Sequence, residues 1–92
     1  MSIAVRFSPK SLTIEKHTEV TQRLEKAGAW PPAGLDYHVV FGSDGNLQVG
    51  EVWDSPERFH AFGETLMPVL ADVGIEFSGD PEVLEIHHSF RR

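Results

Sequence analysis

The segment of residues 36–53 constrains the fold more than any other part of the chain. Apolar and polar residues alternate on both sides of Asp44-Gly45, and an Asp-Gly pair between alternating segments is the strongest short-range signal of a β-hairpin. With these two residues at the centre of the turn, the register of the hairpin is fixed. His38 is then expected directly opposite Glu51, with the two Cβ atoms about 4.5–5.5 Å apart.

The same register divides the hairpin into two faces. One face carries Asp36, His38, Val40, Val49, Glu51 and Trp53, with Asp36 opposite Trp53. The other carries Leu35, Tyr37, Val39, Phe41, Gly50 and Val52. Both faces are largely apolar, and a sheet with two apolar faces needs a cover on each. Helices of the chain can cover one face, so a second subunit is the simplest cover for the other.

Four further elements surround the hairpin. Residues 2–7 alternate as a strand that Pro9 ends. A helix is expected over residues 13–28, and a second over 56–74, each with a capping Thr or Ser at its start and Gly at its end. Residues 82–90 predict a last strand. The order β-α-β-β-α-β indicates a single α+β domain over residues 1–92, a ferredoxin-like four-stranded antiparallel sheet with two helices on one face.

Charge and composition exclude several classes of partner. The 92 residues carry a net charge of -6, which argues against nucleic acid and anionic membrane surfaces. No segment approaches the roughly 20 apolar residues that cross a bilayer, and the start of the chain lacks the apolar core of a signal peptide. A cytoplasmic location is therefore expected. The absence of cysteine excludes disulfide and thiolate chemistry.

Three stretches carry a resemblance to a known superfamily: "WPPAGLDYHVVFGSDG", "EVWDSPERFHAF", and "LMPVLADVGI" followed by a strand ending in "EIHH". With them the chain resembles the dimeric α/β-barrel proteins, near the antibiotic biosynthesis monooxygenases. The resemblance covers nearly the whole chain and implies a homodimer whose two sheets form a barrel with the helices outside. It also implies a small-molecule pocket between sheet and helices.

Relatives in this superfamily differ in their chemistry. They include cofactor-free monooxygenases acting on electron-rich phenols, haem-degrading enzymes, and cyclases or lyases that use a histidine. The haem-degrading proteins, similar at "VWDS", use a tryptophan and a histidine in the following helix, where this chain has Phe62 and Asp72. No haem or other cofactor is therefore expected here, and the fold alone does not choose among the remaining activities.

His38 and Glu51 are the best candidates for chemistry. A carboxylate facing an imidazole fixes its tautomer and can leave a general base near neutral pH. The pocket around this base is expected to contain Trp53, Tyr37, His17, Phe62 and Leu66. His17 falls on the inward side of the first helix, where a core histidine bonded to the backbone is an equally strong alternative. For His38 and Glu51, the alternative is a purely structural ion pair between the two strands, because structural pairs perturb titration as well.

The other histidines do not suggest a metal site. His87 and His88 are adjacent, and adjacent residues on a strand point to opposite faces, so they cannot bind one ion together. His60 lies off the apolar side of its helix and is expected at the surface. No metal is expected without cysteine or a tight cluster of ligands.

Two hypotheses from different classes follow. The first is a homodimer that binds a small apolar, aromatic or polyketide-like molecule and acts on it as a cofactor-free monooxygenase, cyclase or lyase, with His38 as base and Glu51 orienting it. The second is a non-catalytic ligand-binding or assembly module, in which His38 and Glu51 form only a structural pair.

Overall fold

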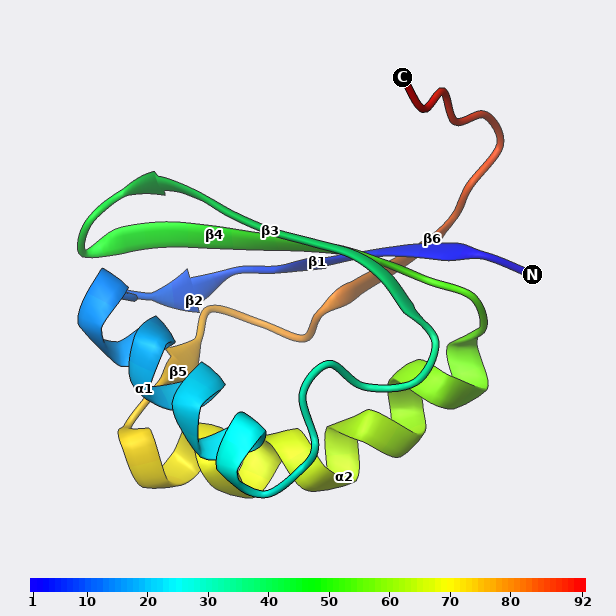
Figure 1. Ribbon diagram of the computed structural model, residues 1–92. Helices are drawn as coiled ribbons and strands as arrows, with labels where there is room; N and C mark the ends of the chain where they lie inside the picture. The colour runs from blue at the N-terminus through cyan, green and yellow to red at the C-terminus, as the bar shows by residue number, and fades with distance from the viewer.

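A four-stranded antiparallel sheet with two helices packed on one face forms the body of the molecule (Figure 1). The computed structural model describes residues 1–92. The helices are α1 (Ile14–Lys26) and α2 (Pro56–Val73). The strands of the sheet are β1 (Ile3–Phe7), β3 (Leu35–Ser43), β4 (Asn46–Trp53) and β6 (Glu82–Glu85). They lie in the order β3-β4-β1-β6, which confirms the predicted ferredoxin-like α+β fold.

A second, two-stranded ladder is an addition to the predicted order. It pairs β2 (Pro9–Lys10) with β5 (Glu76–Phe77). Both strands have only two residues, too few for a visible alternation of polar and apolar side chains. The ladder joins the segment after β1 to the segment after α2, and Phe77 thereby reaches the ring of Phe7, with 5.9 Å between the ring centroids.

Both helices begin and end at the predicted signals. The side chain of Thr13 accepts a hydrogen bond from the backbone N–H of Lys16, and α1 is followed by Gly28 at a φ of 72°. Ser55 caps α2 in the same way, and Gly74 ends it at a φ of 85°. A left-handed backbone at these two positions favours glycine. Neither helix is long and apolar enough to cross a membrane.

The hairpin has the predicted register over most of its length. His38 pairs with Glu51, Val40 with Val49 and Ser43 with Asn46. The predicted pairing of Asp36 with Trp53 is wrong, because the register shifts between Leu35 and Tyr37 and Leu35 becomes the partner of Trp53. The shift lets the apolar Leu35 pack against the core while Asp36 stays exposed, as expected for a bulge near a strand end.

The last strand is shorter than predicted. It ends at Glu85, which pairs with Ile3, the first residue of β1. Beyond Ile3 the neighbouring strand offers no further backbone partners, so residues 86–92 leave the sheet. This segment runs away from the body of the molecule on the side opposite the helices (Figure 1).

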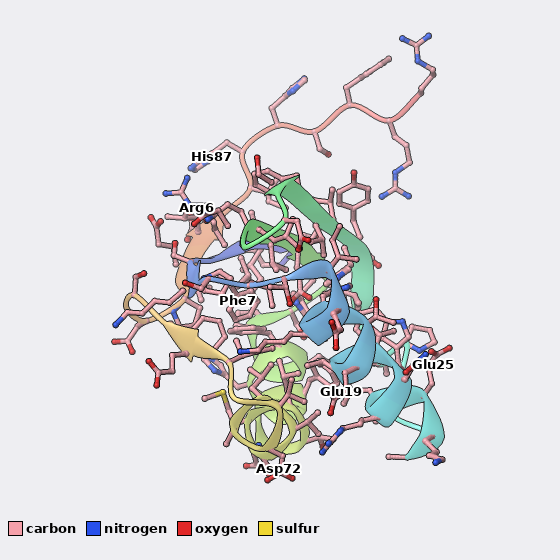
Figure 2. All side chains as sticks on the ribbon, turned by 90° about the vertical axis from the view of Figure 1, so that its left-hand side faces the viewer. Arg6, Phe7, Glu19, Glu25, Asp72 and His87 are labelled. Atoms are coloured by element: carbon pink, nitrogen blue, oxygen red, sulfur yellow. The ribbon has the colours of Figure 1, made fainter.

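Alternation along the strands separates a buried face from an outer face. Phe7 points toward the helices and Arg6 away from them (Figure 2). The core between sheet and helices contains Ile3, Val5, Phe7, Leu12, Val20, Leu24, Leu47, Val49, Trp53, Phe59, Phe62 and Leu70. The face that holds His38 and Glu51 is therefore the one that the helices cover.

The tip of the hairpin is tied to the start of α1. The backbone N–H groups of Gly45 and Leu47 both donate to the carbonyl of Leu12. The side chain of Asp44 accepts from the backbone N–H of Ile14 at 2.9 Å. These bonds fix where α1 begins relative to the hairpin, and so which turn of α1 faces His38.

Candidate functional site

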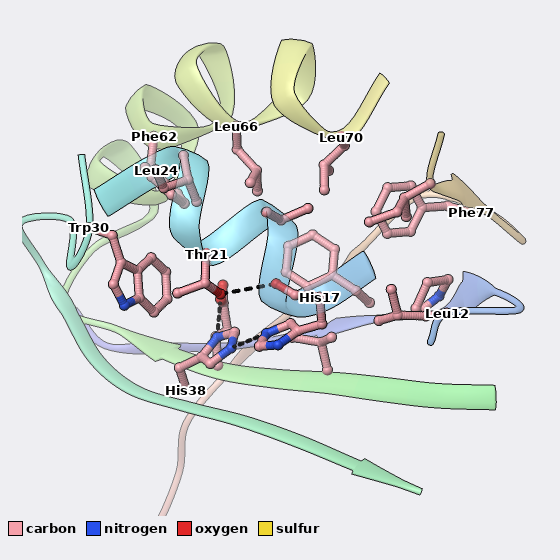
Figure 3. A pocket seen from close by; sticks show the side chains of 16 residues that line it. Leu12, His17, Thr21, Leu24, Trp30, His38, Phe62, Leu66, Leu70 and Phe77 are labelled. Atoms are coloured by element: carbon pink, nitrogen blue, oxygen red, sulfur yellow. Dashed lines mark hydrogen bonds and ion pairs between the residues drawn. The ribbon is translucent and has the colours of Figure 1, made fainter. Parts of the chain in front are cut away.

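A partly open cavity lies between α1, α2 and the buried face of the sheet (Figure 3). It offers about 70 Å³ to the centres of water-sized molecules. Its walls are mostly apolar, and the polar side chains among them are His17, Thr21, His38 and Glu51. A largely apolar pocket with a few converging polar groups is the usual form of a small-molecule site.

Glu51 is the polar centre of the buried face. Its residue is 6% exposed, and both carboxylate oxygens have a partner. Oε2 lies 2.7 Å from Nδ1 of His38, and Oε1 accepts from Nε1 of Trp53 at 2.9 Å. Since a carboxylate without a donor would be costly at this depth, the two donors explain why Glu51 is tolerated among apolar residues. The predicted contact between His38 and Glu51 is present.

His17 reaches the same point from α1. Its Nε2 lies 3.4 Å from Nε2 of His38, and the two rings are nearly parallel, with 16° between their planes and 5.6 Å between their centroids. His17 is on the inner side of α1, as predicted, since residues 17, 20, 21 and 24 all line the cavity.

Burial of the imidazole lowers the pKa of His17 below its ordinary value, and the adjacent His38 lowers it further. The charged form loses hydration inside the apolar cavity, and a second imidazolium nearby would repel it. His17 is therefore kept neutral near neutral pH, with a lone pair on one of its two nitrogens.

Trp30 is a wall residue that the sequence did not indicate. Its ring meets His38 edge-on, with 5.1 Å between centroids and 79° between planes, and it also lines the cavity. It comes from the loop between α1 and β3. An aromatic residue inside the breaker-rich "AWPPAG" is the signal that could have pointed to it, because loops held by a rigid scaffold often carry binding residues.

Two of the predicted pocket residues do not line the cavity. Tyr37 is on the outer face of the sheet and is 55% exposed, so its assignment to the pocket is wrong. It neighbours His38 in sequence, and neighbours on a strand point to opposite faces. Trp53 is fully buried and reaches the site through its hydrogen bond to Glu51 and through its ring, whose centroid is 5.6 Å from that of Phe62. Phe62 and Leu66 of α2 line the cavity as predicted.

The remaining histidines lie elsewhere. His60 is exposed on α2, and His87 and His88 are exposed in the segment after β6, where His87 is labelled in Figure 2. No group of three or more His, Asp or Glu side chains in residues 1–92 is arranged to hold a metal ion.

Solved structures with the same fold include several antibiotic biosynthesis monooxygenase-like proteins. A candidate monooxygenase of this type from Chloroflexus aurantiacus matches with a TM-score of 0.62 and 16% identity over 98% of each chain. SnoaB from Streptomyces nogalater, a cofactor-independent oxygenase, matches with a TM-score of 0.58 and 15% identity over 99% of this chain and 96% of its own. The structural genomics protein YJCS matches with a TM-score of 0.66 and 9% identity over 95% of this chain and all of its own.

No family model and no curated protein sequence matches the chain. The structural matches define the class of fold: the chain has the same α+β fold as the solved antibiotic biosynthesis monooxygenase-like proteins. At these identities they establish the fold and leave the activity to be argued from the site.

Proposed function

We propose that the protein binds a small, largely apolar molecule in the cavity between α1, α2 and the sheet, and removes a proton from it. The observation that carries this proposal is the buried pair of Glu51 and His38, 2.7 Å apart at the wall of an apolar cavity. A carboxylate that orients an imidazole is the usual support of a histidine general base. SnoaB, which has the same fold, is a cofactor-independent oxygenase.

Two kinds of reaction fit a base in this setting. In cofactor-free oxygenation, loss of a proton from an electron-rich aromatic compound gives an anion that reacts with O₂. A CH₂ group thereby becomes a carbonyl, and one oxygen atom leaves as water. In a cyclase or lyase reaction the same anion forms or breaks a bond within the substrate. Both reactions need the proton removed first, which is the step proposed for the polar site built around His38 and Glu51.

The size of the cavity limits how a ligand is held. An engineered apolar cavity of about 150 Å³ holds benzene, and the space here is about 70 Å³. The enclosed part therefore receives the reacting end of an aromatic or polyketide-like ligand, and the rest of the ligand extends through the open side. Trp30 and Phe62, whose ring centroids are 6.4 Å apart, supply apolar wall for its ring.

We also propose that the molecule is a homodimer joined through the outer face of the sheet. An apolar row crosses this face through consecutive strand pairings, from Tyr37 to Val52, Ala4 and Leu84. Tyr37 and Leu84 are both more than half exposed. An exposed apolar patch of this kind is typical of a protein interface, and a second sheet of the same kind is its natural cover.

The second hypothesis is a non-catalytic binding module. It is supported by the complete hydrogen bonding of Glu51, whose two oxygens are both satisfied within the chain. Such a network stabilises a core without any ligand.

Replacement of His38 by alanine distinguishes the two hypotheses. Small hydroxyaromatic compounds and 1,3-dicarbonyl compounds would be screened by thermal shift, and those that bind tested for O₂ uptake and for new products by mass spectrometry. We expect turnover in the wild type and in His60→Ala, whose histidine is exposed on α2, and a clear loss of turnover in His38→Ala, because the proton-transfer site then lacks the imidazole that Glu51 orients. Unchanged affinity in His38→Ala, with no turnover by the wild type, would instead support the binding module.

A further inference from the structure

His38 has no free nitrogen with which to accept a proton from a ligand. Its Nδ1 is 2.7 Å from Glu51, and its Nε2 is 3.4 Å from Nε2 of His17. A general base must present a lone pair within hydrogen-bond reach of the proton that it removes. In this arrangement His38 presents no such lone pair to a ligand, so another residue of the site has to provide it.

When both imidazoles are neutral, their hydrogen-bond partners decide which nitrogen of each ring carries the proton. A carboxylate accepts, and Glu51 already accepts from Trp53, so its bond to His38 is donated by Nδ1–H of the imidazole. A neutral His38 then has its lone pair on Nε2 and accepts from Nε2–H of His17. A neutral His17 with its proton on Nε2 has its own lone pair on Nδ1.

Nδ1 of His17 is available to a ligand. It makes no hydrogen bond within the chain, and the only fully buried side-chain polar atom without a partner is Asp54 Oδ1, so His17 Nδ1 is not sealed from the cavity or solvent. The ionisable groups facing His17 are His38 from β3 and, behind it, Glu51 from β4. The residues from α2 and β5 that share the cavity are apolar: Phe62, Leu66, Leu70 and Phe77.

We infer that His17 is the residue that takes the proton of the ligand, and that His38 carries the resulting charge beside Glu51. This inference rests on the proposed proton-transfer function. The bond between the proton and its atom in the ligand breaks, and an N–H bond forms at Nδ1 of His17. The proton on Nε2 of His17 passes to Nε2 of His38. No electrons are gained or lost, and the ligand keeps the electron pair as an anion.

The relay moves positive charge to where it is stabilised. An imidazolium at His17 would lie among apolar side chains, whereas an imidazolium at His38 is in contact with the carboxylate of Glu51. The attraction between opposite charges is strongest where water is excluded. The 3.4 Å separation between the two Nε2 atoms is long for proton transfer, but hydrogen bonds in unliganded sites commonly shorten once a ligand is bound.

The first test observes the ring nitrogens of the wild-type protein by ¹H–¹⁵N NMR and needs no substrate. Near neutral pH we expect the proton of His38 on Nδ1 and that of His17 on Nε2. A proton on Nε2 of His38, or a proton on Nδ1 of His17, would overturn the inference.

The second test follows exchange of the acidic C–H protons of nitroethane in D₂O, using a carbon acid small enough for the cavity. The experiment compares the wild type with His17→Gln, with His38→Gln and with the exposed control His60→Gln. We expect His17→Gln to lose about 100-fold or more of the rate. His38→Gln should lose less, because His17 still presents a base, and His60→Gln should match the wild type.

The order of the two variants decides between the assignments. If His38→Gln is the slower of the two, His38 contacts the ligand directly and the inference is wrong. If the wild type exchanges no faster than buffer, the proposed function fails and the catalytic role of His17 fails with it, even when the ring tautomers are as expected. The NMR experiment still decides the hydrogen-bond order if either variant does not fold.

Discussion

Charged side chains on the two faces of the sheet differ in their exposure and in their partners. On the buried face, Glu51 is 6% exposed and both its oxygens are bonded to side chains of neighbouring positions. On the outer face, Glu82 forms an ion pair with Arg6 while both side chains stay about half exposed. A glutamate thus belongs to a buried hydrogen-bond network on one face and to a solvent-exposed ion pair on the other.

The apolar residues show the reverse pattern. Those of the buried face are covered by α1 and α2, whereas the row of Tyr37, Val52, Ala4 and Leu84 on the outer face is not covered by any element of the chain. The buried face is complete within one subunit except for its cavity. The outer face is incomplete, and this contrast separates the place where a ligand is expected from the place where a second subunit is expected.

The largest expected effect is the replacement of Glu51 by alanine. It leaves the donors on His38 and Trp53 without an acceptor in the core, and we expect a loss of about 3–4 kcal/mol in the free energy of unfolding. The matched control is Glu82→Ala on the outer face, where an exposed pair contributes less than about 1 kcal/mol. Denaturant unfolding measures both. Equal losses would remove the contrast between the two faces.

The next effect concerns assembly. Val52→Glu places a charge in the middle of the outer apolar row, and we expect the dimer dissociation constant to rise by about 100-fold or more, equivalent to about 2.7 kcal/mol. Sedimentation equilibrium gives the constant. Gln22→Glu adds the same charge on the exposed side of α1 and should leave assembly unchanged. A wild-type protein that is a stable monomer at micromolar concentration would contradict the proposed dimer.

A smaller effect is expected from the titration of His17. Because burial and His38 lower its pKa in the folded state, the unfolded chain binds a proton at a higher pH than the folded one. The associated stability is fully present above the ordinary pKa of about 6.5 and is lost as the pH falls below that value. Unfolding measured from pH 8 down to pH 5 should show this loss in the wild type. An equal loss in His17→Gln would show that another group causes it.

The smallest expected effect concerns the quenching of tryptophan fluorescence. In a Trp30→Phe variant the only remaining tryptophan is Trp53, which is 0% exposed, so iodide should hardly quench its fluorescence. The wild type, which also has the partly exposed Trp30, should be quenched more. Quenching of the variant as strong as in the denatured chain would mean that the buried face opens to water.

The sequence predicted the fold because its signals are local. The Asp44-Gly45 turn fixes the register that sets His38 opposite Glu51, and Thr13 and Ser55 fix where the helices begin. Each of these signals depends on residues within a few positions of one another. The strand ends were predicted less well. The end of β6 depends on where its neighbour β1 begins, and the bulge near Asp36 depends on whether Leu35 or Asp36 packs against the core.

The site was only partly predictable for a related reason. The contact between His38 and Glu51 follows from the register, but the contact between His17 and His38 depends on the packing of α1 against the hairpin. The side from which Trp30 approaches depends on the path of a loop. No pattern within a single helix or strand shows how separate elements pack together. The sequence therefore placed His17 on the inner side of its helix but did not predict its contact with His38.

Because the order of the sheet places β3 at an edge, His38 belongs to a strand with a neighbour on one side only. An edge strand can detach at a lower free energy than the strands inside the sheet. Detachment of β3 would separate His38 from Glu51 and uncover Leu35 and Val40, but none of the 12 buried core residues belongs to this strand. The bonds from the hairpin tip to Leu12 and Ile14 oppose this at one end of the strand. Amide hydrogen exchange in β3 is thus a direct measure of how often the site is disassembled in the folded protein.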